Sequence, residues 1–285
     1  MPRKPKMTDE ERRAYTAKMR GELEAVMDRA YGAMVASEEF WTTVMRAAAT
    51  LTDRGPVNSI AIAAQRPHAT RVLSSGDWRK VGRFPAKGST SIRIWTPIKQ
   101  RSGDAQDAAA AAADGGQREA ASDAAEGGER RVSGYKAGPV FDIGQTDGDP
   151  YEPPAAARLT AEAVWAVIAG ADEVPGGCGH AVRLHLYNAA FQRISEMDAP
   201  VRGQREAEVA SAAHVAALIL GITPGPAVMP PLAGIITQGK KPPVHESAVR
   251  VIETGRAIAH AITTAAENRR ELVPAVDPHP RTWFN

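Results

Sequence analysis

Cysteine, aromatic residues and long apolar runs are all scarce in this sequence. The single cysteine, Cys178, excludes an intramolecular disulfide framework and a zinc site built from several cysteines, and it is typical of a reducing compartment. No run of about 18 apolar residues occurs, so no membrane-spanning helix is expected. The first residues, MPRKPKMTDEERR, lead into no apolar stretch and do not resemble a secretory signal. We therefore expect a cytoplasmic protein without a membrane partner.

Charge is distributed unevenly along the chain, although the formal net charge is only +2. Residues 1–101 carry 19 Lys and Arg against 10 Asp and Glu, a net charge of +9, and the last part, 130–285, is close to neutral. Between them, residues 102–129 are an Ala/Gly-rich segment with seven acidic residues and one arginine, and we expect it to be a disordered acidic insertion. The basic first third favours a polyanionic partner.

The pattern of caps, breakers and apolar spacing predicts an α+β protein. Thr8 and Glu11 form a capping box that opens a helix to about residue 30, with Tyr15, Met19, Leu23 and Val26 on its buried stripe. Further helices are predicted over 37–51, 56–65, 159–169, 204–220 and 246–266, strands over 71–73, 82–84, 91–95 and 138–143, and a hairpin with arms 181–186 and 192–197.

These elements predict two domains. N-terminal helices and a small antiparallel sheet form the first, from 1–101 and 130–155, around the 102–129 insertion. Residues 156–270 form a mostly helical second domain, followed by a loose tail over 271–285.

One segment carries a specific motif. Residues 56–97 read PVNSIAIAAQRPHATRVLSSGDWRKVGRFPAKGSTSIRIWTP, and VFDIGQTDGDP follows at 140–150. In order and spacing, this resembles the single-stranded-DNA-binding domain of ArdC-type antirestriction proteins, which occur on plasmids, phages and mobile elements. The chain departs from that family's pattern at Ser89, where an acidic residue is usual.

The same segment has the residue types that bind a single strand of DNA. Cations track the phosphates and flat side chains stack on the bases in sequence-tolerant binding. The residues that we predict to bind nucleic acid are Asn58, Gln65, Arg66, Arg71, Trp78, Lys80, Arg83 and Lys87, with Arg79 as a further cation and Phe84 or Trp95 as further stacking residues.

Structural roles are open for several of these residues. Trp78 and Trp95 are also suited to the core of the small sheet. Asn58 and Gln65, seven residues apart on a helix, are also placed to brace the strand that follows.

The family resemblance implies a second domain like a zinc metallopeptidase, with His-Glu-x-x-His on a helix. No such motif occurs here. Either the helix around His214 has lost the glutamate and second histidine, or the helix with Glu206 and Glu208 corresponds to a later ligand-bearing helix. His214 and Glu208 remain weak candidates for metal ligands. We expect no catalytic residue and no cofactor, and a degenerate, zincin-like domain whose helices are either a retained scaffold or a surface for a protein partner or a second copy.

The sequence thus favours a single-stranded DNA-binding protein of a mobile element or phage, with an antirestriction or DNA-protecting role and no catalysis. One alternative is a metallopeptidase with a non-standard zinc site. Another is an interaction module that inhibits a host nuclease through the acidic 102–129 segment, although seven acidic residues in 28 are sparse for DNA mimicry.

Overall fold

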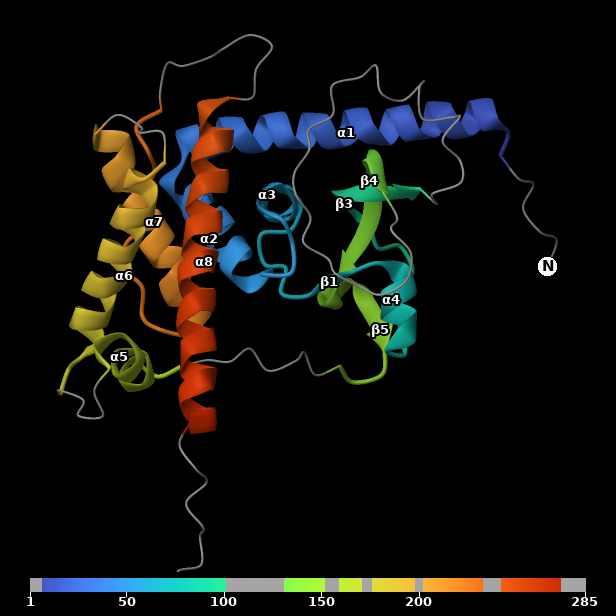
Figure 1. Ribbon diagram of the computed structural model, residues 1–285. Helices are drawn as coiled ribbons and strands as arrows, with labels where there is room; N and C mark the ends of the chain where they lie inside the picture. Colours follow the sequence, from blue (N-terminus) through green and yellow to red (C-terminus); the bar gives the residue numbers. More distant parts are fainter. Residues whose placement is uncertain are drawn as a thin grey trace, which may run out of the picture. The chain divides into compact units, whose positions relative to one another are not determined.

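A computed structural model describes residues 7–100, 131–151, 159–170, 176–197, 202–232 and 242–272. The acidic insertion predicted over 102–129 and the tail beyond residue 272 lie outside them. The chain divides into two compact units: unit 1 comprises residues 1–30 and 60–151, and unit 2 comprises residues 31–59 and 152–285 (Figure 1). Among the described helices, none has the length and apolar character needed to cross a membrane.

Unit 1 is built on two small antiparallel sheets. Its elements are most of α1 (Asp9–Ala36), the end of α3 (Pro56–Gln65), β1 (Val72–Leu73), α4 (Ser75–Lys80), β2 (Arg83–Pro85), β3 (Ile92–Gln100), β4 (Arg131–Asp142) and β5 (Thr146–Gly148). One sheet has the order β1-β4-β3, and β2 pairs with β5 in the other.

The core of the larger sheet follows from the alternation of side chains along β3 and β4. Ile92 lies opposite Val140, and Ile94 lies opposite Gly138. Ile92, Ile94 and Val140 are buried, so these residues mark the inner face of the sheet. The neighbouring Arg93 and Trp95 point to the other face and are half-buried.

Unit 2 is helical in the residues that the structure describes. It contains α2 (Glu38–Thr50), α5 (Ala161–Ala169), α6 (Gly179–Ser195), α7 (Arg202–Leu220) and α8 (Pro243–Leu272). Helix α7 packs against α2, α6 and α8 (Figure 1). The contact with α8 is close at Gly255, where an added Cβ would lie 2.7 Å from the carbonyl oxygen of Ala212.

The α+β prediction is confirmed, since helices predominate and small antiparallel sheets accompany them. The capping box is also confirmed: the Thr8 backbone N–H donates to a carboxylate oxygen of Glu11 at 2.7 Å, and the Glu11 N–H donates to Thr8 Oγ1 at 3.2 Å. The buried stripe of α1 differs in part, because Tyr15 is exposed and Met27 is buried with Met19 and Leu23.

The predicted hairpin over 181–186 and 192–197 is wrong, because one helix, α6, covers the first arm and most of the second. Its buried side chains recur every four residues, at Val182, Leu186, Ala190 and Ile194. This spacing places them on one helical face, whereas a strand would require alternation.

The division of the chain also differs from the predicted domains. Residues 31–59 group with the C-terminal half, because α2 buries Trp41 and Val44 within unit 2. The Trp41 indole N–H donates to the Ser211 hydroxyl of α7 at 3.0 Å.

Candidate nucleic-acid interface

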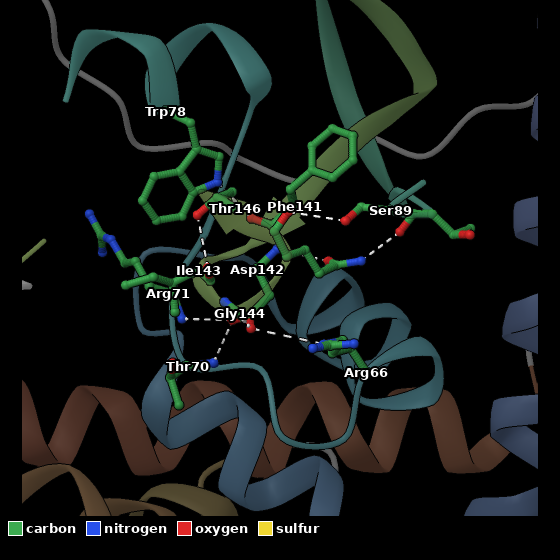
Figure 2. A network of polar contacts seen from close by, with 12 residues as sticks. Arg66, Thr70, Arg71, Trp78, Ser89, Phe141, Asp142, Ile143, Gly144 and Thr146 are labelled. Carbon is green, nitrogen blue, oxygen red and sulfur yellow. Dashed lines mark hydrogen bonds and ion pairs between the residues drawn. The ribbon is translucent and has the colours of Figure 1, made fainter. Parts of the chain in front are cut away.

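Asp142, at the end of β4, organises the loops of unit 1 (Figure 2). Its carboxylate accepts hydrogen bonds from the backbone N–H groups of Thr70 at 2.9 Å, Arg71 at 3.2 Å and Gly144 at 3.0 Å. The Arg66 guanidinium lies 3.9 Å from the same carboxylate. The loop between α3 and β1 is thereby fixed to the end of β4.

This arrangement gives two predicted DNA contacts a structural role. The Arg66 guanidinium already faces the buried Asp142 carboxylate, although the Arg66 side chain is 43% exposed. Arg71 is half-buried, and its backbone carbonyl accepts a hydrogen bond from the Ile143 N–H at 2.9 Å. The Arg66 guanidinium therefore serves the fold at Asp142, whereas Arg71 contributes its backbone to this network and its side chain is directed away from Asp142 (Figure 2).

Gln65 acts as the brace that its position allowed. Its amide donates to the Arg93 carbonyl at 2.8 Å and accepts from the Arg93 N–H at 2.9 Å. These two bonds cover the outer edge of β3, where a backbone would otherwise be open to pairing. Asn58 lies on the same helix, α3, in the part of the chain that groups with unit 2.

Trp78 is a core residue, and its prediction as a base-stacking surface is wrong. The side chain is fully buried, and its indole N–H donates to the Phe141 carbonyl at 2.8 Å (Figure 2). The ring also makes an edge contact with Tyr151, with centroids 5.3 Å apart. A tryptophan without an exposed face cannot stack on a base.

Arg83 clamps β2 to β5. Its Nε donates to Thr146 Oγ1 at 3.0 Å, one Nη donates to the Thr146 carbonyl at 2.7 Å, and the other Nη donates to the Asp149 carbonyl. Three of its five N–H donors are therefore used within unit 1. The predicted phosphate contact of Arg83 is thus limited to the donors that remain.

Three exposed cations and one exposed aromatic ring remain in the segment that comprises the end of α4, β2 and the turn after β2. We call Arg79, Lys80, Phe84 and Lys87 the β2 surface. Phe84 is 53% exposed, although a phenylalanine in a small sheet is normally covered. The alternation of β2 explains this, because Arg83 and Pro85 point to the half-buried face and Phe84 points to the other.

The charges of the β2 surface are available to a ligand. Arg79 and Lys87 are exposed, and neither side chain has a hydrogen bond or ion pair with the described residues. Lys80 pairs with Asp77 at 2.7 Å, but both side chains are largely exposed, so the pair is weak and exchangeable. Gly82 and Gly88 form the turns on either side of β2, where their φ values of 71° and 87° favour glycine.

The candidate metal ligands of α7 are engaged in structural contacts. Glu208 is fully buried; its carboxylate lies 2.7 Å from Nε of Arg250 and accepts hydrogen bonds from Ser247 at 2.7 Å and Gln204 at 2.9 Å. His214 follows six residues later, about 120° away around the helix. The two side chains therefore do not converge on one point.

His214 is held by the loop that follows α7. Its Nδ1 lies 2.7 Å from the Gly225 carbonyl, which places a proton on that nitrogen. Burial lowers the pKa of His214, with a small further lowering from the Arg46 charge, against the opposing effect of the Gly225 carbonyl. Within the described ranges, no group of three His, Cys, Asp or Glu side chains is placed to hold a metal ion.

No family model and no curated protein matches the chain. Among solved structures, the chain is similar to the metal-free crystal structure of the antirestriction protein ArdC from plasmid R388, with 15% identity and a TM-score of 0.42. The match covers 86% of this chain and 98% of that one. That protein belongs to the family that residues 56–97 resemble. At this identity and TM-score, the similarity assigns neither a ligand nor an activity.

Proposed function

We propose that unit 1 binds single-stranded DNA through the β2 surface, in a protein of the antirestriction type that acts by binding and without catalysis. The observation that carries the proposal is Phe84, an exposed ring that lies between the exposed cations Arg79 and Lys87 in the sequence. Base stacking on an aromatic ring and phosphate attraction to nearby cations are the two components of sequence-tolerant single-strand binding.

The geometry favours a single strand over a duplex. The bases of a duplex are stacked on one another, so an isolated aromatic ring has no free base to contact. In a single strand, a base stacks on Phe84 while its flanking phosphates approach Arg79, Lys80 or Lys87. The elements that carry the β2 surface are also short, since α4 has six residues and β2 and β5 have three each, so they lack the length of a helix or ribbon that enters a major groove.

The antirestriction part of the proposal rests on the motif at 56–97 and on the absence of His-Glu-x-x-His from the sequence. A zinc peptidase requires converging ligands and a general base. Glu208 is instead neutralised by Arg250. A role in protecting or handling DNA therefore fits the residues better than peptide hydrolysis does.

Fluorescence anisotropy with the full-length chain tests the proposal. We expect a labelled single strand to bind at low salt, the matched duplex to bind more weakly, and affinity to fall steeply between roughly 50 and 200 mM salt. Equal affinity for both forms, or no binding at low salt, would reject it.

Two pairs of variants assign the binding to the β2 surface. Phe84→Ala should weaken single-strand binding about tenfold through lost stacking, whereas Phe191→Ala, at a 44% exposed phenylalanine of unit 2, should have no effect. Lys87→Ala should reduce the salt slope by about 0.7, and Lys18→Ala, at an exposed lysine of α1, should leave it unchanged. Equal effects within either pair would place the DNA elsewhere.

A further inference from the structure

Asp147 is an exposed carboxylate on the same face as Phe84, which is unexpected for a surface that attracts phosphates. The β2–β5 register pairs Phe84 directly with Asp147. The Ala86 N–H donates to the Gln145 carbonyl at 2.8 Å, and the Asp149 N–H donates to the Gly82 carbonyl at 3.3 Å. Hydrogen-bonded pairs alternate with non-hydrogen-bonded pairs along an antiparallel ladder. Phe84 and Asp147 lie midway between the Ala86–Gln145 and Gly82–Asp149 pairs, so they also form a hydrogen-bonded pair, with Cα atoms about 5.5 Å apart.

The two faces of this ribbon have different tasks. Arg83 and Thr146 lie on the face that is bonded into unit 1. Phe84 and Asp147 lie on the opposite face, and both are exposed. The Asp147 side chain has no hydrogen bond or ion pair with the described residues, so its two carboxylate oxygens are available as acceptors.

A base stacked on Phe84 would present its edge to this carboxylate. Guanine is the base whose Watson–Crick edge carries two adjacent donors, N1–H and the N2 amino group, which match two carboxylate oxygens. Adenine and cytosine offer one amino group beside an acceptor nitrogen, and thymine offers one N–H between two carbonyls. Unstacked bases of single strands are read at this edge, and paired hydrogen bonds to a charged group are the strong ones.

We propose that Asp147 makes the β2 surface selective for guanine, with the base stacked on Phe84 and its N1–H and N2 amino group donating to the Asp147 carboxylate. The inference depends on the proposed binding of single-stranded DNA and adds a base preference to it. The cost of placing a carboxylate near phosphates is then offset where the bound base is guanine.

The test compares three single strands of about twelve nucleotides by anisotropy, in a lithium buffer that avoids guanine quadruplexes. One strand is all thymine, one alternates guanine with thymine, and one alternates hypoxanthine, which lacks only the N2 amino group, with thymine. We expect the guanine strand to bind about three- to tenfold more tightly than the other two, the gain of a solvent-exposed bidentate contact.

Asp147→Asn should abolish this preference, because an amide has one acceptor oxygen in place of two. Asp28→Asn, an identical charge change at an exposed position of α1, should keep it. If Asp147→Asn strengthens binding to all three strands equally, the carboxylate only repels phosphate and the inference is wrong. Equal wild-type affinity for the three strands would also overturn it, while leaving the proposed function intact. If none of the strands binds, the proposed function itself has failed.

Discussion

Unit 1 and unit 2 differ in the interactions that stabilise each of them internally. In unit 1, side chains reach the backbone of distant segments: Asp142 accepts three N–H groups, Gln65 covers an edge of β3, and Arg83 joins β2 to β5. In unit 2, small side chains allow helices to approach closely, as at Gly255. Directed hydrogen bonds fix short loops that have little apolar surface to bury, whereas long helices obtain their stability from a shared apolar face.

This difference bears on function. A surface made of short strands and turns leaves side chains such as Phe84 and Lys87 free to contact a ligand, provided that the backbone beneath is rigid. The polar network of unit 1 supplies that rigidity. Helical packing in unit 2 supplies a scaffold, in which the buried carboxylate of Glu208 is paired with Arg250.

The substitution with the largest expected effect removes the Asp142 carboxylate from the hydrogen-bond network of unit 1. Asp142→Ala leaves three backbone N–H groups without their acceptor, so we expect the free energy of unfolding of unit 1 to fall by about 2–4 kcal/mol. Hydrogen exchange measured by mass spectrometry should show faster exchange over residues 69–73 and 142–146. Unchanged exchange in these two segments would mean that water replaces the Asp142 carboxylate without cost. Asp28→Ala, at an exposed residue of α1, serves as the control.

The next effect concerns the close packing of unit 2. Gly255→Ala places a Cβ 2.7 Å from the Ala212 carbonyl oxygen and 2.7 Å from the Val215 Cβ, so α7 and α8 must move apart. We expect a loss of about 1–3 kcal/mol in stability.

Gly32→Ala gives the matched control in the same unit. This glycine lies in α1, where an added Cβ meets nothing within 4 Å. Higher helix propensity should therefore raise stability by about 0.5–1 kcal/mol. Chemical denaturation of the two variants should give changes of opposite sign, and two stabilising changes would show that the α7–α8 contact is loose.

Much of the fold could be predicted from local signals. The Thr8–Glu11 box and the Ser37 cap mark helix starts, and Ser37 Oγ accepts the Phe40 N–H at 3.1 Å. Such signals act within one turn of chain. The membership of residues 31–59 in unit 2 was missed because it depends on contacts such as Trp41 with Ser211, which are distant in sequence.

The candidate site was predicted less well than the fold, for a related reason. A motif shows which residue types occur together, but not which of them the fold uses for its own hydrogen bonds. Trp78 and Arg83 match the motif and serve the structure. The sequence favours Trp78 over Phe84 for stacking, and the signal for Phe84 is the alternation within Arg83-Phe84-Pro85, which puts Phe84 on the face opposite the arginine.

A smaller effect separates the two kinds of cation in unit 1. The sequence predicts that both Arg83 and Lys87 contact phosphates, but in the structure only the Arg83 side chain is hydrogen-bonded within unit 1. Arg83→Ala removes the clamp between β2 and β5 and should cost about 1–2 kcal/mol of stability, whereas Lys87→Ala should change stability by less than about 0.5 kcal/mol. Thermal unfolding beside the binding measurements distinguishes them, and equal melting temperatures would show that the Arg83 hydrogen bonds contribute little.

The smallest effect tests a polar contact within the helical unit. Burial lowers the pKa of His214 below its ordinary value of 6.5, so the unfolded chain takes up a proton at a higher pH than the folded chain does. The stability due to neutral His214 is therefore complete above about pH 6.5 and is lost as the pH falls toward the folded-state pKa.

Because burial also lowers the pKa of His185, His214→Asn should reduce the acid-induced fall in melting temperature without abolishing it. The asparagine amide can still donate toward the Gly225 carbonyl, so stability near neutral pH should be largely kept. An unaltered pH dependence in this variant would show that the His214 site admits enough water to accept a charge, and the packing of unit 2 around α7 would then be less tight than the contact at Gly255 indicates.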